Sequence, residues 1–404
     1  MKYLELPALC LVVLIGVSDQ ARSDFARRHF APEEVQTTLG GAATRLQNGL
    51  LAVLNAPHLQ AADREAAPQL AREHDVRAVG IVLDLDAPDP SEHHRAALLR
   101  SGLGGPDSPG LHAEGFRTVY RLRTEAELEG TELRRMPLPP DHRELHGPFD
   151  LIGDVHGCLP ELLSLLEQLG YALNGEVVTP PPGRTLVFLG DLTDRGPDSP
   201  GVLRLVMDMV VAGTALCVQG NHDAKLLRAL QGHAVQLTHG LEVTLDQFTR
   251  QPPDVQPPGF AETVKAFLAG LPSHLLLDGG NLVAAHAGLP AHLQGRDSRR
   301  VWAFALYGDV DRSGPPSGDG LPNRRDWAAG YHGPALVAYG HTPVQFPRWK
   351  HRTVNLDTGC VFGGQLSALR YPELKTVSVP ARAVYREAGR APVGVPVEER
   401  QPDL

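Results

Sequence analysis

Short apolar runs recur along the chain, separated by turn residues or by stretches with helical spacing. Within about the first 130 residues, four runs have the length and β-branched content of strands, namely 9–15, 50–54, 76–83 and 117–122. The stretches between these runs carry apolar residues at helical intervals. Strands that alternate with helices predict a parallel α/β unit.

Five further apolar runs follow, and each of them leads directly into a short polar block. They span residues 149–152, 185–189, 215–218, 282–285 and 335–339. This pattern predicts a second α/β domain. Because open α/β sheets build ligand sites where their strands end, the residues just after these runs are candidates for such a site.

A proline-containing stretch at 136–147 separates the two halves and predicts an interdomain linker. We therefore expect a parallel α/β domain at 1–135, this linker, a second α/β domain at 148–385 and a polar, flexible tail at 386–404. A chain of 404 residues is long enough for two domains that each bury a core.

Charge and cysteine usage narrow the class of protein. The formal net charge of −9 argues against coating nucleic acid through bulk electrostatics, although a local basic groove stays compatible with it. Four cysteines without CxxC pairing favour reduced, buried thiols and a cytoplasmic location. The run 9–17 resembles an export signal but lacks its basic flank and cleavage pattern, so we expect a buried strand. No run approaches the ~20 apolar residues of a membrane span, so we expect no membrane partner.

The five polar blocks contain side chains that commonly ligate metals. They read Gly153-Asp154-Val155-His156-Gly157, Gly190-Asp191-Leu192-Thr193-Asp194-Arg195-Gly196, Gly220-Asn221-His222-Asp223, His286-Ala287-Gly288 and Gly340-His341-Thr342. Asp154 and His156 alternate with Val155, so on an extended strand end their side chains face the same side and can bind one cation. This mixed oxygen and nitrogen set suits Mn²⁺, Fe or Zn²⁺ better than Ca²⁺.

Asp191 is the natural carboxylate to bridge two cations, and Asn221, His286 and His341 would complete the second cation site. For a lone histidine, a satisfied polar group is the more common role. Five such blocks in this order, however, are poorly explained as five unrelated structural polar groups. The sequence therefore predicts a binuclear centre.

Three further residues are candidate catalytic groups. His222 follows Asn221 and can face the substrate, so we expect it to be the general acid, with Asp194 orienting it. Arg195 offers a bidentate fork to phosphate oxygens, with a structural ion pair as its alternative role. Asp357, which precedes Thr358-Gly359, either supports a metal-bound histidine or forms a turn.

The blocks resemble those of calcineurin-like metallophosphoesterases. Longer strings resemble the phosphatase module of bacterial polynucleotide kinase-phosphatases over nearly all of residues 146–382, among them His146-Gly147-Pro148-Phe149-Asp150, Ala303-Phe304-Ala305-Leu306-Tyr307-Gly308 and Asp357-Thr358-Gly359-Cys360-Val361-Phe362-Gly363-Gly364. The resemblance implies a metallophosphoesterase α/β sandwich with two divalent ions, Mn²⁺ first. It also implies RNA or nucleotide 2′ and 3′ ends as substrates, with RNA-repair proteins as partners.

In that family a P-loop kinase precedes the phosphatase, and residues 16–23 are similar to its phosphate loop. Such a loop needs a second glycine and a lysine, but here Ala21 and Arg22 stand at these positions, while Asp19 and Asp24 add negative charge. Asn55 ends the second strand where the family has an aspartate. We therefore expect a degenerate P-loop kinase-like domain without ATP or kinase activity.

The predicted function is hydrolysis of phosphomonoesters and of 2′,3′-cyclic phosphodiesters at RNA ends, by attack of a metal-bridging hydroxide. The same chemistry on a phosphoprotein, or on a dinucleoside tetraphosphate cleaved symmetrically, is the first alternative. A non-catalytic scaffold for RNA repair is the second. The complete metal blocks make this scaffold the weaker interpretation.

Overall fold

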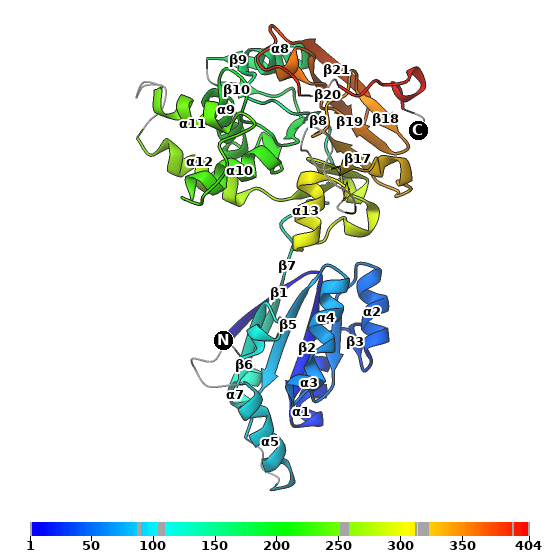
Figure 1. Cartoon of the computed structure of the whole chain (residues 1–404). Helices are drawn as coiled ribbons and strands as arrows, with labels where there is room; N and C mark the ends of the chain where they lie inside the picture. The colour runs from blue at the N-terminus through cyan, green and yellow to red at the C-terminus, as the bar shows by residue number, and fades with distance from the viewer. Residues whose placement is uncertain are drawn as a thin grey trace. The chain divides into compact units, whose positions relative to one another are not determined.

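The structure is a computed structural model that describes residues 2–86, 90–103, 110–175, 177–250, 258–311, 313, 323–389 and 392–402. The chain forms two compact units (Figure 1). Unit 1 comprises Met1–Pro139 with Gly295–Arg300, and unit 2 comprises Pro140–Gln294 with Val301–Leu404. Both units combine helices with β-sheets, which confirms the predicted mixed α/β class.

Unit 1 is built on a five-stranded parallel sheet in the order β3-β4-β2-β5-β6. Its strands are β2 (Cys10–Gly16), β3 (Val35–Gln36), β4 (Ala52–Asn55), β5 (Arg77–Leu83) and β6 (Thr118–Leu122). The central strand β2 is buried on both faces, since its alternate residues pack into two separate cores. Burial on both faces explains its continuous apolar run.

Helices connect the parallel strands of unit 1, as such a sheet requires. They include α1 (Asp19–His29), α2 (Leu39–Gln47), α4 (Ala66–Glu73) and α5 (Pro90–Leu103). Strand β2 leads into α1, whose first turn is capped by Ser18: its hydroxyl oxygen accepts the N–H of Ala21 at 3.3 Å. A separate two-stranded sheet pairs β1 (Lys2–Pro7) with β7 (Thr131–Met136) in parallel. The sequence did not predict these two strands or β3.

Unit 2 contains two five-stranded mixed sheets. One has the order β12-β11-β8-β20-β21 and the other the order β13-β14-β17-β19-β18. The first sheet consists of β8 (Phe149–Ile152), β11 (Thr185–Phe188), β12 (Ala215–Cys217), β20 (Gln365–Tyr371) and β21 (Lys375–Pro380). The second consists of β13 (His274–Leu277), β14 (Leu282–Ala285), β17 (Leu336–Tyr339), β18 (Arg348–Lys350) and β19 (Thr353–Asn355).

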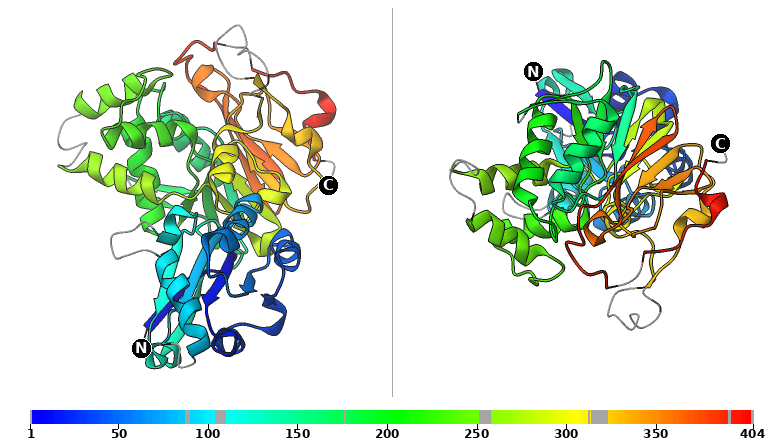
Figure 2. Two further views of the ribbon diagram at one scale, coloured as in Figure 1. Left: turned by 60° about the horizontal axis from the view of Figure 1, so that its bottom comes forward. Right: turned by 90° about the horizontal axis from the view of Figure 1, so that it is seen from above.

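The two sheets share one buried core, which includes Leu151, Val187, Leu275, Ala284 and Val354. Apolar side chains from both sheets therefore form the inside of a sandwich. Helices α8 (Leu159–Leu169), α9 (Ser199–Val211), α10 (Asn221–Leu230) and α12 (Phe260–Gly270) pack in a second core against the first sheet. Figure 2 shows the green helices gathered to one side of the orange strands. Helix α13 (Arg299–Tyr307) contributes to a third core beside the second sheet.

Two segments expected to lie outside the folded domains make regular contacts with unit 2. The N–H of Leu276 donates to Pro140 O at 2.8 Å, and the N–H of Asp278 donates to Leu145 O at 2.8 Å, so part of the expected linker pairs with β13. In the expected tail, Val395 is buried and the N–H of Val393 donates to Pro343 O at 2.9 Å. Partners distant in sequence provide these contacts, and local composition does not reveal them.

None of the helices in the described ranges combines the length and apolarity that crossing a membrane requires. All four cysteines are buried and free of disulfides.

Candidate metal centre

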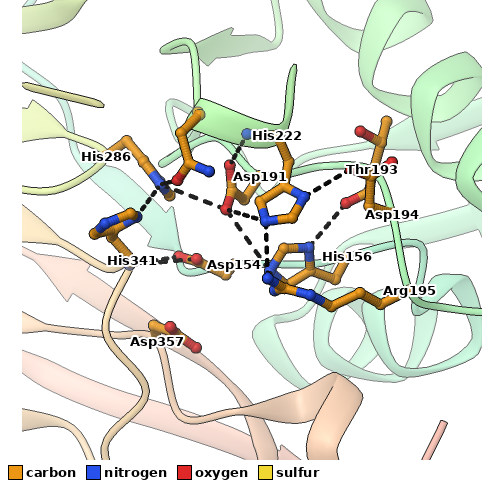
Figure 3. A network of polar contacts seen from close by, with 12 residues as sticks. Asp154, His156, Asp191, Thr193, Asp194, Arg195, His222, His286, His341 and Asp357 are labelled. Atoms are coloured by element: carbon orange, nitrogen blue, oxygen red, sulfur yellow. Dashed lines mark hydrogen bonds and ion pairs between the residues drawn. The ribbon is translucent and has the colours of Figure 1, made fainter. Parts of the chain in front are cut away.

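The predicted site residues meet where strands of the two sheets in unit 2 end. Asp154 and His156 follow β8, and Asp191 follows β11, while Asn221 and His222 open helix α10 after β12. From the second sheet, His286 follows β14 and His341 follows β17. Figure 3 shows these side chains turned toward one another, with Asp191 between the pair His286 and His341 and the pair His156 and His222.

Asp191 is the common member of two groups whose ligand atoms lie within 4.8 Å of one another: Asp191 with His156 and His222, and Asp191 with His286 and His341. Its Oδ2 atom is 3.4 Å from Nε2 of His286 and 3.7 Å from Nε2 of His156. Its Oδ1 atom accepts the N–H of His222 at 2.9 Å. One carboxylate thus faces both groups.

Carbonyl oxygens fix the orientation of two imidazoles. Nδ1 of His156 lies 2.8 Å from Thr193 O, and Nδ1 of His286 lies 3.1 Å from Leu189 O. Because a carbonyl only accepts, each Nδ1 carries the proton and each Nε2 presents a lone pair. These are the protonation states of metal-binding histidines.

Lone pairs converge around His286. Its Nε2 atom lies 3.0 Å from Oδ1 of Asn221 and 2.9 Å from Nδ1 of His341. Nε2 of His341 is buried, and no atom in the part of the chain that the structure describes forms a hydrogen bond with it. A cation between Oδ1 of Asn221, Nε2 of His286 and Nδ1 of His341 would satisfy these three acceptors together, which a single shared proton cannot do.

Asp154 lies beside His341. Both of its carboxylate oxygens are 3.2 Å from the backbone nitrogen of His341. A Cβ atom at Gly340 would come within 2.1 Å of Oδ1 of Asp154, so only glycine allows this approach. Asp154 lies outside the two groups that contain Asp191, although it belongs to the same buried network (Figure 3).

Arg195 lies on the opposite side of Asp191, against the second pair of histidines. One guanidinium nitrogen is 2.6 Å from Nε2 of His156, and another is 2.8 Å from Nε2 of His222. The guanidinium also lies over the ring of Phe362, 5.3 Å from its centroid. Arg195 therefore faces the site, which is the direction that a phosphate-binding role requires.

A hydrogen-bonded chain supports His222 from behind. Its Nδ1 lies 2.6 Å from Oδ2 of Asp194, and Oδ1 of Asp194 accepts the hydroxyl of Thr244 at 2.6 Å. This arrangement leaves Nε2 of His222 facing the site. Thr244 comes from α11 (Leu241–Arg250), and no sequence signal pointed to it.

Several site residues adopt left-handed backbone conformations. The φ angles are 47° for His156, 48° for Asp191, 75° for Asp194, 73° for Arg195 and 74° for His341. Residues other than glycine rarely adopt such angles, and their backbone strain concentrates at functional sites.

Burial shifts the ionisation of the whole cluster. It raises the pKa of Asp191 to about 7 and that of Asp154 well above its usual range. It lowers the pKa of His286 to about 3 and that of His156 and His341 well below the usual value. Without a cation, the buried carboxylates resist charge while the imidazoles stay neutral. Bound cations would stabilise the charged carboxylates, so this donor set fits divalent metal ions.

Two further aspartates complete the surroundings. Oδ1 of Asp357 accepts the N–H of Gly359 at 3.1 Å, a contact that a turn-forming aspartate makes; this was one of its two predicted roles. Asp223 accepts the N–H groups of Leu192 and Gly220, both at 3.0 Å, and so joins two of the polar blocks. The capping pattern at the start of α10 could have revealed Asp223, which sequence reasoning passed over.

Comparison with known proteins identifies the same region. The family described as "Calcineurin-like phosphoesterase" matches residues 147–374. A protein of Anoxybacillus flavithermus named bis(5′-nucleosyl)-tetraphosphatase PrpE [asymmetrical] is 47% identical over 237 residues, which cover 59% of this chain and 96% of that protein. The Bacillus subtilis protein of the same name is 46% identical over 245 residues, 61% of this chain and 99% of that protein.

A solved structure titled as a putative diadenosine tetraphosphatase is 28% identical, with a TM-score of 0.44. Its match covers 60% of this chain and 96% of that structure.

Proposed function

Because the chain belongs to the calcineurin-like phosphoesterase family, we propose that the cluster around Asp191 is its active site and that it hydrolyses phosphate esters of nucleotides. The observation that carries this proposal is the position of Asp191, whose carboxylate faces two separate groups of histidines. A shared carboxylate is what a two-metal hydrolase needs.

We assign the cation ligands as follows. Asp154, His156 and Asp191 would hold one ion, and Asp191 would share the other with Asn221, His286 and His341. Members of this family use a dinuclear divalent centre, and the mixed donors favour Mn²⁺ over Ca²⁺. Such ions supply positive charge at the phosphoryl group and lower the pKa of bound water.

The residues beside this centre have separate roles. Nε2 of His222 would donate a proton to the leaving oxygen, because Asp194 holds Nδ1 and leaves Nε2 directed at the site. Arg195 would donate to the phosphate oxygens and neutralise charge that develops during the reaction. No nucleophilic side chain is needed for direct attack by water.

The first substrate class that we propose is the 2′- or 3′-phosphate, or the 2′,3′-cyclic phosphate, of an RNA end. The strings around residues 146–150 and 357–364 support it, because they resemble a polynucleotide kinase-phosphatase. A second class has independent support. Two relatives with 46–47% identity are named as asymmetrical bis(5′-nucleosyl)-tetraphosphatases, so dinucleoside polyphosphates are the second candidate.

A substrate panel separates these two classes. The full chain with added Mn²⁺ is assayed on 3′-phosphorylated RNA, 2′,3′-cyclic nucleotide, diadenosine tetraphosphate and a phosphopeptide. We expect the highest kcat/KM on the RNA end and the cyclic nucleotide. A preference for diadenosine tetraphosphate would replace the first candidate by the second, and activity on none of the four would remove the nucleotide proposal.

For unit 1 we propose a degenerate P-loop kinase-like domain. The parallel strand order and the turn from β2 into α1 support this assignment. Arg22 stands where a phosphate loop has its lysine, and its side chain is buried. Its guanidinium donates to Gly16 O, to Asp19 and to Asn55, the last at 3.3 Å. These contacts occupy Arg22 with partners inside the protein, so it is not available to nucleotide phosphates.

A further inference from the structure

A second group of potential metal ligands lies in unit 2 and shares no residue with the two groups around Asp191. Its members are Cys158, Glu161 and Cys360, all buried, and their sulfur and carboxylate atoms lie within 4.8 Å of one another. Cys158 precedes helix α8, Glu161 lies in the first turn of that helix, and Cys360 opens a short 3₁₀ turn, Cys360–Phe362. Residues distant in sequence therefore meet at one point.

The carboxylate of Glu161 is held firmly at one oxygen and unsatisfied at the other. Oε1 accepts the backbone N–H of Arg382 at 2.8 Å and the hydroxyl of Tyr385 at 2.9 Å. Oε2 is buried and has no hydrogen-bond partner among the described residues, and Glu161 as a whole is 1% exposed. A buried carboxylate oxygen without a partner is costly, so this atom points to a missing ligand.

We propose that Cys158, Cys360 and Glu161 form a structural binding site for a thiophilic divalent cation of the Zn²⁺ type. Two sulfurs and one carboxylate oxygen are donors that Zn²⁺ accepts. Each thiol loses its proton to solvent as a sulfur–metal bond forms. Arg382 and Tyr385 would orient the carboxylate, as groups behind a metal ligand commonly do.

Oxidation of the two thiols to a disulfide is the competing use of this cluster. It would leave Oε2 of Glu161 without a partner, whereas a cation satisfies that atom and both sulfurs together. Both thiols are also buried, which limits their access to dissolved oxidants. The geometry therefore favours the cation.

The site would act by joining two parts of the fold. Cys158 lies two residues after His156, and Cys360 lies three residues after Asp357. A metal between them would tie the start of α8 to the turn that leads into β20. Its expected effect is on stability and on the rigidity of these loops, and it takes no part in the reaction.

Cobalt substitution of the full chain tests this proposal. Metal-free protein is titrated with Co²⁺ under anaerobic conditions, and the sulfur-to-cobalt charge-transfer absorption in the near ultraviolet is recorded. The Asp191 cluster offers only nitrogen and oxygen donors, so it gives no such band. We expect the band in the parent chain and its loss in Cys158→Ser and Cys360→Ser. Glu161→Gln should lower the Co²⁺ affinity at this site by at least about tenfold.

Cys10→Ser and Cys217→Ser are matched controls, because both thiols are buried and neither belongs to the cluster; both variants should keep the band. Thiols of the unreduced parent chain are also counted in denaturant. Four reactive thiols are expected from the four cysteines. No band in the parent chain, a band that persists in both cluster variants, or two thiols that react only after reduction would each overturn the proposal. The test is independent of the proposed function, because the absorption band is measured without any hydrolysis assay.

Discussion

At the scale of single residues, the candidate active site is defined by acceptor atoms that face one another. Three acceptor atoms lie close to Nε2 of His286: His341 Nδ1 at 2.9 Å, Asn221 Oδ1 at 3.0 Å and Asp191 Oδ2 at 3.4 Å. The proton of His286 is on Nδ1, where Leu189 O accepts it. Such a cluster is unfavourable without positive charge inside it. Changes at individual ligands should therefore affect metal content and hydrolysis together.

Asp191→Ala should abolish hydrolysis, because one carboxylate faces both groups of histidines. We expect a loss of at least about 10³-fold in kcat/KM, since both metal sites lose a ligand. Steady-state kinetics and metal analysis of the purified variant measure the outcome. Asp208→Asn on the exposed side of α9 is the control and should behave like the parent chain. Near-normal turnover with unchanged metal content in Asp191→Ala would remove the binuclear assignment.

His222→Ala separates a general acid from a metal ligand, since His222 also lies in one of the two groups around Asp191. As an acid it should lose about 10²- to 10⁴-fold on alkyl phosphates and much less on nitrophenyl phosphate, whose leaving group needs no proton. Asp194→Asn should show the same pattern more weakly. Equal losses on both substrates with a loss of bound metal would instead make His222 a ligand.

At the scale of elements, the site depends on how closely the loops after neighbouring strands approach. The loop after β11 carries Asp191, and the loop after β12 carries Gly220, where helix α10 begins. A Cβ atom at Gly220 would lie 2.1 Å from the backbone nitrogen of Asp191 and 2.2 Å from its Oδ1. The glycine is therefore required by packing between two loops.

Gly220→Ala should displace Asp191 and reduce hydrolysis strongly, with a loss of about 1–3 kcal/mol in unfolding free energy from overpacking. Denaturant unfolding and kinetics of the same preparation test this. Gly270→Ala, at the end of α12, is the matched control because a Cβ there meets nothing within 4 Å. If both variants behave alike, close packing of the two loops does not position Asp191.

At the scale of the whole molecule, the family match covers residues 147–374, which belong to unit 2 except for Gly295–Arg300. Unit 1 contributes a parallel sheet with a loop and helix after its central strand. Arg22, which stands at the position of the lysine in the P-loop assignment that we propose, has partners inside the protein. A planar guanidinium held by three partners is a poor substitute for a lysine free to reach phosphate.

We therefore predict that the full chain transfers no labelled phosphate from ATP to a 5′-hydroxyl oligonucleotide. Calorimetry on the Asp191→Ala variant, in which the phosphoesterase centre is disabled, should also show no MgATP binding at millimolar concentration. Arg22→Lys with Asp19→Ala in the same background tests whether the internal partners are the cause. Clear MgATP binding in Asp191→Ala alone would show that unit 1 keeps a nucleotide site.

The local sequence pattern predicted the strands that lead into the site and the polar residues that follow them. The runs at 149–152 and 282–285 coincide with β8 and β14, whose residues are all buried. β14 is apolar throughout, as a strand buried on both faces requires, while the buried Asp150 in β8 is paired with Arg184 and Arg370. Asp154 and His156 directly follow the first of these runs, and Asp191 follows the run at 185–189, so their place at strand ends could also be predicted. A strand can be predicted from the sequence when its burial leaves a local run of apolar residues.

Which groups from distant parts of the sequence meet depends on the tertiary structure. Thr244 contacts Asp194 from a helix fifty residues later in the chain. Strand β1 at the start of unit 1 pairs with β7, which lies near the end of its first segment. Likewise, Glu161 is an ordinary helix residue in the sequence, and it becomes a candidate ligand because folding buries it beside Cys158 and Cys360. Pairings of this kind depend on the packing of the whole unit, which no local window of the sequence contains.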